Sequence, residues 1–313
     1  MARRPGQDCG CSRWPLRATR SDLHRTSGAQ PAANRGTRAM NTVPFSLRRV
    51  GLIAGVTLRE ALRQKLLHAL VLIAAGLVLG VRGLRDFNFG ISELKFIADF
   101  GDGAIAGFGA ALTIALTAQL FFSEIEHRTA LTLLAKPVWR TEFLLGKFLG
   151  VAVVAVAFCG LLTATLVGVL GQRQLALQVD QPEAWAAAHA VNFGALWVSA
   201  YLHALKLALL AAGTLLVASF AQTQIFAVMA GGAGFVICHL QGLAQAAYER
   251  NAASLMSVPA TLIHWMFPDF QRFVLPADGT WTWSGLAQVS VYAGVYAAVA
   301  LALAVRSFRE REV

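Results

Sequence analysis

The sequence predicts an all-α integral membrane protein with six transmembrane helices. Of its 313 residues, 56% are hydrophobic and only 14% are charged, whereas a soluble domain carries about 25% charged residues. The mean hydropathy is +0.56. The apolar residues gather in blocks of about 20, the length that an α-helix needs to cross a bilayer. These observations exclude a soluble globule, a disulfide-stapled secreted module, a collagen and a disordered chain.

The net charge of +10 reflects membrane topology rather than a nucleic-acid-binding face, because most basic residues flank the apolar blocks. Residues 1–39 form a basic leader with no apolar run that could serve as a signal peptide. We expect this leader to be disordered and to lie outside the functional chain, which we place at residues 40–313.

Six apolar runs are candidate membrane spans. They are Leu66–Val81, Gly103–Phe122, Phe148–Leu170, Ala195–Ser219, Ile225–Leu243 and Gly285–Val305. The connecting segments on one side (40–65, 123–147, 219–224 and 306–313) hold 12 Lys and Arg, and those on the other side (82–102, 171–194 and 244–284) hold 6. The positive-inside rule therefore places the first set and both termini in the cytoplasm.

A helix that is polar along one side is predicted before the first span, over residues 46–64. Its polar arc includes Arg48, Arg49, Arg59 and Arg63, although Leu52 and Val56 interrupt it. The segment fits an interfacial helix whose arginines are attracted to anionic lipid. The alternative is a basic flank of the first span that serves only topology.

The most structured polar stretch is residues 123–150, SEIEHRTALTLLAKPVWRTEFLLGKFLG. Ser123 and Glu126 have capping-box spacing, which predicts a new helix starting at Ser123. Pro137 should end that helix, and a second helix should restart near Trp139 and run into the third span. The pattern is typical of a cytoplasmic docking element for a soluble partner, the alternative being an ordinary solvated loop.

This stretch resembles the intracellular segment of ABC-2 type transporter permeases, most of all the branch that includes permeases linked to multi-copper enzyme maturation and gliding motility. His127 and Trp139 have no counterpart there. The matching residues are Glu124, Glu126, Thr129, Leu133, Leu134, Pro137, Arg140, Leu144, Leu145, Gly146 and Lys147.

The resemblance implies a non-catalytic permease subunit of the bacterial inner membrane that moves an unidentified substrate, in the direction of export. It would pair with a second permease subunit, as a homo- or heterodimer, and with two separate ATP-binding subunits that hold ATP and Mg. This chain would bind no metal or cofactor. The expected ATPase-coupling residues are Glu124, Glu126, Arg128, Thr129, Lys136, Pro137, Arg140 and Lys147.

The sequence contains no complete P-loop, which is consistent with ATP binding by a separate subunit. Its nearest approach to a P-loop, ending at Gly146 and Lys147, has Thr141 at the first Gly position and Phe148 where Ser or Thr belongs. Two other function classes compete with the permease. One is an ATP-independent carrier or channel, for which we see no internal repeat, and the other is a membrane cytochrome.

Away from the span edges, where His68 lies, His203 and Lys206 in the fourth span and His239 in the fifth are the candidate intramembrane charges. Such residues indicate function by default. They could form a bis-His haem pair, a polar patch on the substrate path, or a set of outer-interface residues. The last interpretation needs the fourth span to begin near Leu205, so that Lys206 can extend to the interface.

Overall fold

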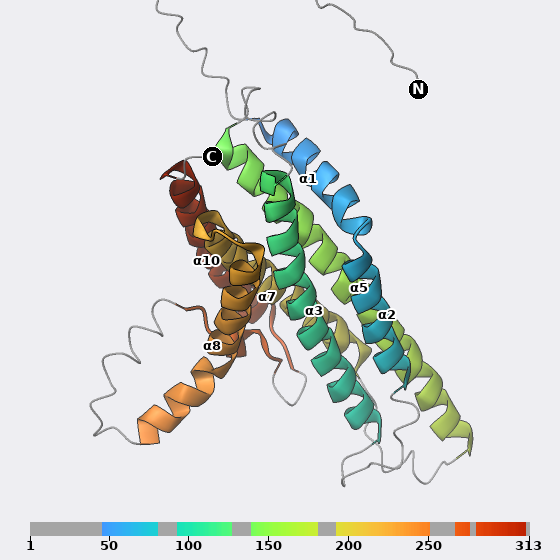
Figure 1. The fold of residues 1–313 in the computed structure, drawn as a ribbon. Coiled ribbons are helices and arrows are strands. Elements are labelled where there is room, and N and C mark those ends of the chain that lie inside the picture. The colour runs from blue at the N-terminus through green and yellow to red at the C-terminus, as the bar shows by residue number, and fades with distance from the viewer. Residues whose placement is uncertain are drawn as a thin grey trace, which may run out of the picture. The chain divides into compact units, whose positions relative to one another are not determined.

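The computed structural model describes residues 46–80, 93–126, 139–180, 192–250, 267–275 and 280–310. All of them belong to the second of two compact units, Val43–Val313. Within these residues the fold is all-helical, as predicted, with seven α-helices and one 3-10 helix (Figure 1). They are α1 (Leu47–Leu62), α2 (Lys65–Gly80), α3 (Glu93–Glu126), α5 (Arg140–Asp180), α7 (Phe193–Phe220), α8 (Gln224–Arg250), η3 (Phe270–Phe273) and α10 (Trp283–Glu310).

Five of the six predicted spans are confirmed as helices long and apolar enough to cross a membrane. The helices are longer than the predicted spans. Four of them, α3, α5, α8 and α10, continue through charged residues beyond the apolar runs, whereas α7 gains only three uncharged residues. The extreme case is α5, whose 41 residues extend about 62 Å at 1.5 Å per residue, beyond a bilayer of about 40–45 Å with its headgroups.

The remaining predicted span, Leu66–Val81, corresponds to α2, which has only 16 residues. It reaches spanning length only together with α1, from which it is bent by 65°. The chain turns at Arg63 and Gln64, whose N–H groups close the last turn on Glu60 and Ala61. The helix predicted over residues 46–64 is thus present as α1, bent away from α2, and its position at the membrane surface stays a prediction.

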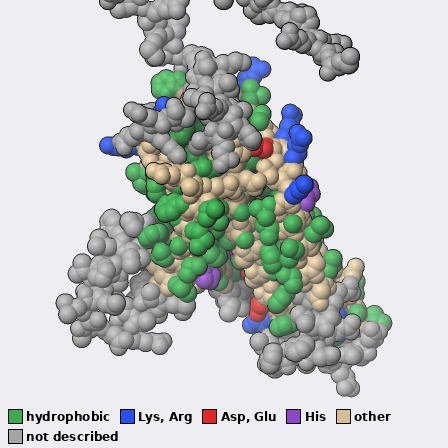
Figure 2. All heavy atoms as spheres, in the orientation of Figure 1, with side chains coloured by type: hydrophobic (Ala, Val, Ile, Leu, Met, Phe, Trp, Pro, Cys, Tyr) green, Lys and Arg blue, Asp and Glu red, His purple; other side chains and the backbone are tan. Residues whose placement is uncertain are grey.

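The helix ends alternate as the sequence predicted. The start of α1, the end of α3, the start of α5 and the end of α10 contact one another at one end of the bundle, here called the α1 end (Figure 1). In the view of Figure 2, most of the visible Lys and Arg side chains lie toward this end, and hydrophobic side chains cover the flanks below it. That this end faces the cytoplasm stays a prediction from the positive-inside rule.

The centre of the bundle is α5, which packs against α1, α2, α3, α7 and α10. The seat of α1 on α5 depends on two glycines four residues apart. A Cβ on Gly146 would lie 2.6 Å from Ile53 Cβ, and one on Gly150 would lie 2.7 Å from Thr57 Cβ. Only glycine permits this approach, which is the small-xxx-small packing common between membrane helices.

Candidate functional site

The α1 end holds a polar junction built around Glu142, whose side chain is fully buried in the first turn of α5. Its Oε1 accepts the backbone N–H of Ser46, at 2.8 Å, and its Oε2 lies 3.2 Å from Arg49 Nη1. The N–H of Trp139 also donates to Oε2, at 3.4 Å. One carboxylate therefore meets the positive N-terminal ends of both α1 and α5, which satisfies its charge despite burial.

A second buried ion pair joins α3 to α5. Lys147 is 2% exposed, and its Nζ lies 2.8 Å from Glu124 Oε1. The same ammonium donates to the Leu120 carbonyl and lies 5.7 Å from the centre of the Phe143 ring. Since breaking a buried pair costs about 3–5 kcal/mol, Lys147 is a strong tie between the two helices.

Further hydrogen bonds bring α10 and the α1–α2 bend into the junction. Arg140 Nη1 donates to the Phe308 carbonyl at 2.9 Å, and its guanidinium lies over the Phe308 ring. Ser123 Oγ donates to Glu60 Oε1 at 3.0 Å, and Gln119 Nε2 donates to Gln64 Oε1 at 2.9 Å. Four helices are thus joined by polar contacts around the ends of α3 and α5.

The capping-box prediction was wrong. No helix starts at Ser123, because α3 runs without a break to Glu126, and the Ser123 hydroxyl bonds to Glu60 and to the Leu120 carbonyl instead. The predicted restart was right, since α5 begins at Arg140.

Half of the predicted coupling residues, Arg128, Thr129, Lys136 and Pro137, lie outside the described residues, as does the side chain of Glu126. The structure does place Glu124, Arg140 and Lys147 at the α1 end and gives each a partner within this chain. The arginines of the predicted interfacial helix also fall into two groups, exposed and paired. Arg48, Arg59 and Arg63 are exposed, while Arg49 pairs with Glu142.

A second polar cluster, here called the Asp102 cluster, lies between α3 and α7, where the Asp102 side chain is 38% exposed. The Asp102 carboxylate accepts the Ser199 hydroxyl at 2.6 Å, and its other oxygen lies 3.0 Å from His203 Nε2. His203 is 5% exposed and Lys206 is 2% exposed. Lys206 lies one turn beyond His203 on α7, with its Nζ 5.7 Å from the centre of the Phe270 ring. Ser199, His203 and Lys206 follow i, i+4, i+7 spacing and so share one face of α7.

In the structure α7 runs unbroken from Phe193, and both His203 and Lys206 are buried against neighbouring helices. Their depth in the membrane, and with it the outer-interface interpretation, stays a prediction. His239, by contrast, is exposed and stacks on Phe235. Among the described residues, the partner that contacts His203 is Asp102 and not His239, so the geometry gives the haem pair no support.

The 3-10 helix η3 covers the Asp102 cluster at the end of the bundle opposite α1. Phe270 and Phe273 are each 1% exposed. Gln271 Nε2 donates to the His239 carbonyl of α8 at 3.1 Å, and the N–H of Asp269 donates to the Tyr292 hydroxyl of α10 at 2.9 Å. The short helix is therefore fixed between α8 and α10, with its aromatic rings turned into the bundle.

Sequence reasoning missed Glu142, Asp102 and Ser199. Glu142 had a usable signal, because an acidic residue in the first turn of a predicted helix is a candidate for capping. Asp102 was overlooked because the predicted second span begins one residue later, at Gly103. A search for an acidic partner to the basic face of α7 would have found it, since a charge inside a membrane protein needs a partner.

Within the described residues, five or six helices are long and apolar enough to cross a membrane, and a polar junction joins α1, α3, α5 and α10 at one end. These features define a multi-pass membrane protein whose basic segments gather at that end. The family model described as ABC-2 family transporter protein matches residues 52–313. The chain belongs to this family and is a membrane permease of an ABC transporter, a kind of subunit that is not itself catalytic. No curated protein matches the sequence.

Proposed function

We propose that this chain is one half of an export permease, driven by ATP hydrolysis in two separate ATP-binding subunits and paired with a second permease subunit in the bacterial inner membrane. The family match over residues 52–313 supports this proposal. The observation that carries the coupling mechanism is the buried Lys147–Glu124 pair, which ties α3 to α5 next to the segment with the docking pattern.

The coupling segment, residues 123–136, begins in the last turn of α3, and α5 begins only a few residues after the segment ends. We assign Lys147 and Glu124 the task of holding these two helices together, and Glu126 and Arg128 the task of meeting charges on the ATPase. A displacement of the segment is then shared by α3 and α5 instead of being absorbed at the loop. Glu142 and Arg140 extend the same movement to α1 and α10.

The test is a reconstitution of the full chain with a candidate P-loop ATPase encoded beside it. Charge reversals at Glu126 and Arg128 are expected to weaken the complex and reduce permease-dependent stimulation of the ATPase, while membrane insertion stays intact. Arg82→Glu, in a segment predicted on the opposite side, is the matched control and should change neither. Wild-type complex formation and stimulation in the Glu126 and Arg128 reversals would contradict the assignment.

A carrier that needs no ATP is the competing function. It predicts that the isolated chain moves solute across reconstituted vesicles without an ATPase. The permease proposal predicts no such movement, and the two outcomes can be compared in the same vesicles with and without the ATPase.

For the Asp102 cluster we propose closure of the outer end of the substrate path. His203 and Lys206 are too deeply buried to line an open path, but they would become accessible if α3 moved away from α7. Ser199→Cys, in a chain without its native cysteines, should react faster with a membrane-impermeant thiol reagent when the ATPase is loaded with nucleotide. Tyr201→Cys, on the exposed side of α7, is the control and should react at an unchanged rate. Equal Ser199→Cys rates with and without nucleotide would refute the closure.

A further inference from the structure

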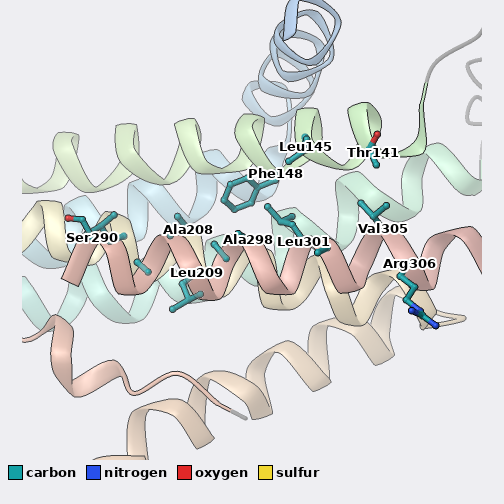
Figure 3. A pocket seen from close by; sticks show the side chains of 15 residues that line it. Thr141, Leu145, Phe148, Ala208, Leu209, Ser290, Ala298, Leu301, Val305 and Arg306 are labelled. Carbon is teal, nitrogen blue, oxygen red and sulfur yellow. The ribbon is translucent and has the colours of Figure 1, made fainter. Parts of the chain in front are cut away.

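An apolar groove of about 990 Å³ runs along α10 between α5 and α7. Figure 3 shows Ser290 at one end of the groove, and Thr141 and Arg306 at the other. Leu145 and Phe148 of α5 point into it from one wall (Figure 3). The groove is open to the outside along its length and lies within the helices that span the membrane.

The dimensions and lining of the groove suit a hydrocarbon chain. From Ser290 to Arg306 it follows α10 for 16 residues, about 24 Å at 1.5 Å per residue, which is most of a hydrocarbon core of about 30 Å. Small residues of α10 leave room along it. They are Ala293, Gly294, Ala297, Ala298 and Ala302. A polar solute would find almost no hydrogen-bonding partner between the two ends.

The positive charge at the α1 end of the groove favours a lipid with an anionic headgroup. Arg306 of α10 and Thr141 of α5 both line the groove at its α1 end, and Arg140 directly precedes Thr141 in α5. A guanidinium binds phosphate oxygens with matching geometry. The positive-inside rule places this end at the cytoplasmic leaflet, whose anionic lipids attract basic side chains.

We propose that this groove binds a phospholipid with an anionic headgroup, with its acyl chain along α10 and its phosphate at Arg306. A second copy of this chain fits less well on the same face. Two copies in one membrane have the same orientation, so α10 would lie parallel to its equivalent across a two-fold axis and bring Arg306 close to Arg306. Like charges at such a contact repel.

The experiment uses the full chain in phosphatidylcholine nanodiscs that contain equal fractions of a photoreactive acyl-chain probe. The probe is either phosphatidylglycerol or phosphatidylcholine, and labelled peptides are mapped by mass spectrometry. The phosphatidylglycerol probe should label the groove residues of α10 about fivefold more than the phosphatidylcholine probe, the effect expected of one basic side chain. Arg306→Gln should remove this preference, and Arg306→Lys should keep most of it.

Filling the groove tests the acyl-chain site separately from the headgroup. Ala298→Phe should abolish labelling along α10, whereas Val299→Phe, at an exposed position outside the groove, should not. Equal labelling by the two probes, or labelling unchanged by Ala298→Phe, would overturn the proposal. A disulfide-linked dimer formed through Ala298→Cys would also overturn it and assign the face to a second copy. No ATPase is present in the assay, so its failure leaves the transport proposal untouched.

Discussion

Adding a single methyl group at Gly146 should separate α1 from α5. A Cβ there would lie 2.6 Å from Ile53 Cβ and 3.2 Å from the Val50 carbonyl oxygen, whereas carbon atoms pack at about 3.5–4.0 Å. Because the backbone of α1 must shift by roughly 1 Å to relieve this contact, we expect an overpacking cost of about 1–3 kcal/mol. The higher helix propensity of alanine offsets about 0.5–1 kcal/mol of this cost. The net effect of Gly146→Ala is a loss of up to about 2.5 kcal/mol.

Gly160 is the matched control, since it lies on the same helix and a Cβ there would meet no atom within 4 Å. Gly160→Ala should therefore be neutral or stabilise the protein by up to about 1 kcal/mol. Thermal unfolding of the full chain in nanodiscs, followed by its tryptophan fluorescence, compares the two variants. Gly146→Ala should unfold several degrees below Gly160→Ala, taking about 2–4 °C for each kcal/mol. Coincident unfolding curves would show that α1 is not seated against Gly146.

Other substitutions test the polar contacts by the same measurement. Lys147→Met should destabilise the chain by about 3–5 kcal/mol, and adding Glu124→Gln should cost less than the sum of the single changes, as a double-mutant cycle would show. Glu142→Gln, which keeps the shape but loses the charge-assisted bonds, should cost about 1–3 kcal/mol, and Glu142→Ala should cost more. Asp102→Leu should be more destabilising than Asp102→Asn, because Asn can still accept a hydrogen bond from His203. A reversed order in either pair would contradict the assigned bonds.

The fold was largely readable from the sequence because hydrocarbon length and charge asymmetry constrain a membrane chain strongly. The spans and the alternation of their ends could be obtained from these two rules. Their boundaries could not, since α3 continues through Asp102 and α5 starts at Arg140, both of them charged. At the membrane surface, a helix is not destabilised by continuing beyond its apolar run. Hydropathy alone therefore predicts helices that are too short.

The polar contacts were readable only in part, because they depend on which helices are neighbours. Lys147 was singled out as a coupling residue, yet its burial against Glu124 arises from the packing of α5 on α3. Gly146 was noted within the family pattern, while its reason, the close approach of Ile53, needs the position of α1. Neither periodicity nor spacing contains this information.

The two polar sites are linked by α3. Asp102 and Glu124 stand 22 positions apart on this unbroken helix, about 33 Å at 1.5 Å per residue. At one end α3 is bound to α5 through Lys147, beside the coupling segment, and near the other it is bound to α7 through Asp102. A rigid helix held at both places cannot move at the coupling end without straining the contact with α7. Separating Asp102 from His203 would leave a buried imidazole without its hydrogen bond, so this movement of α3 is costly until another partner or water replaces that bond.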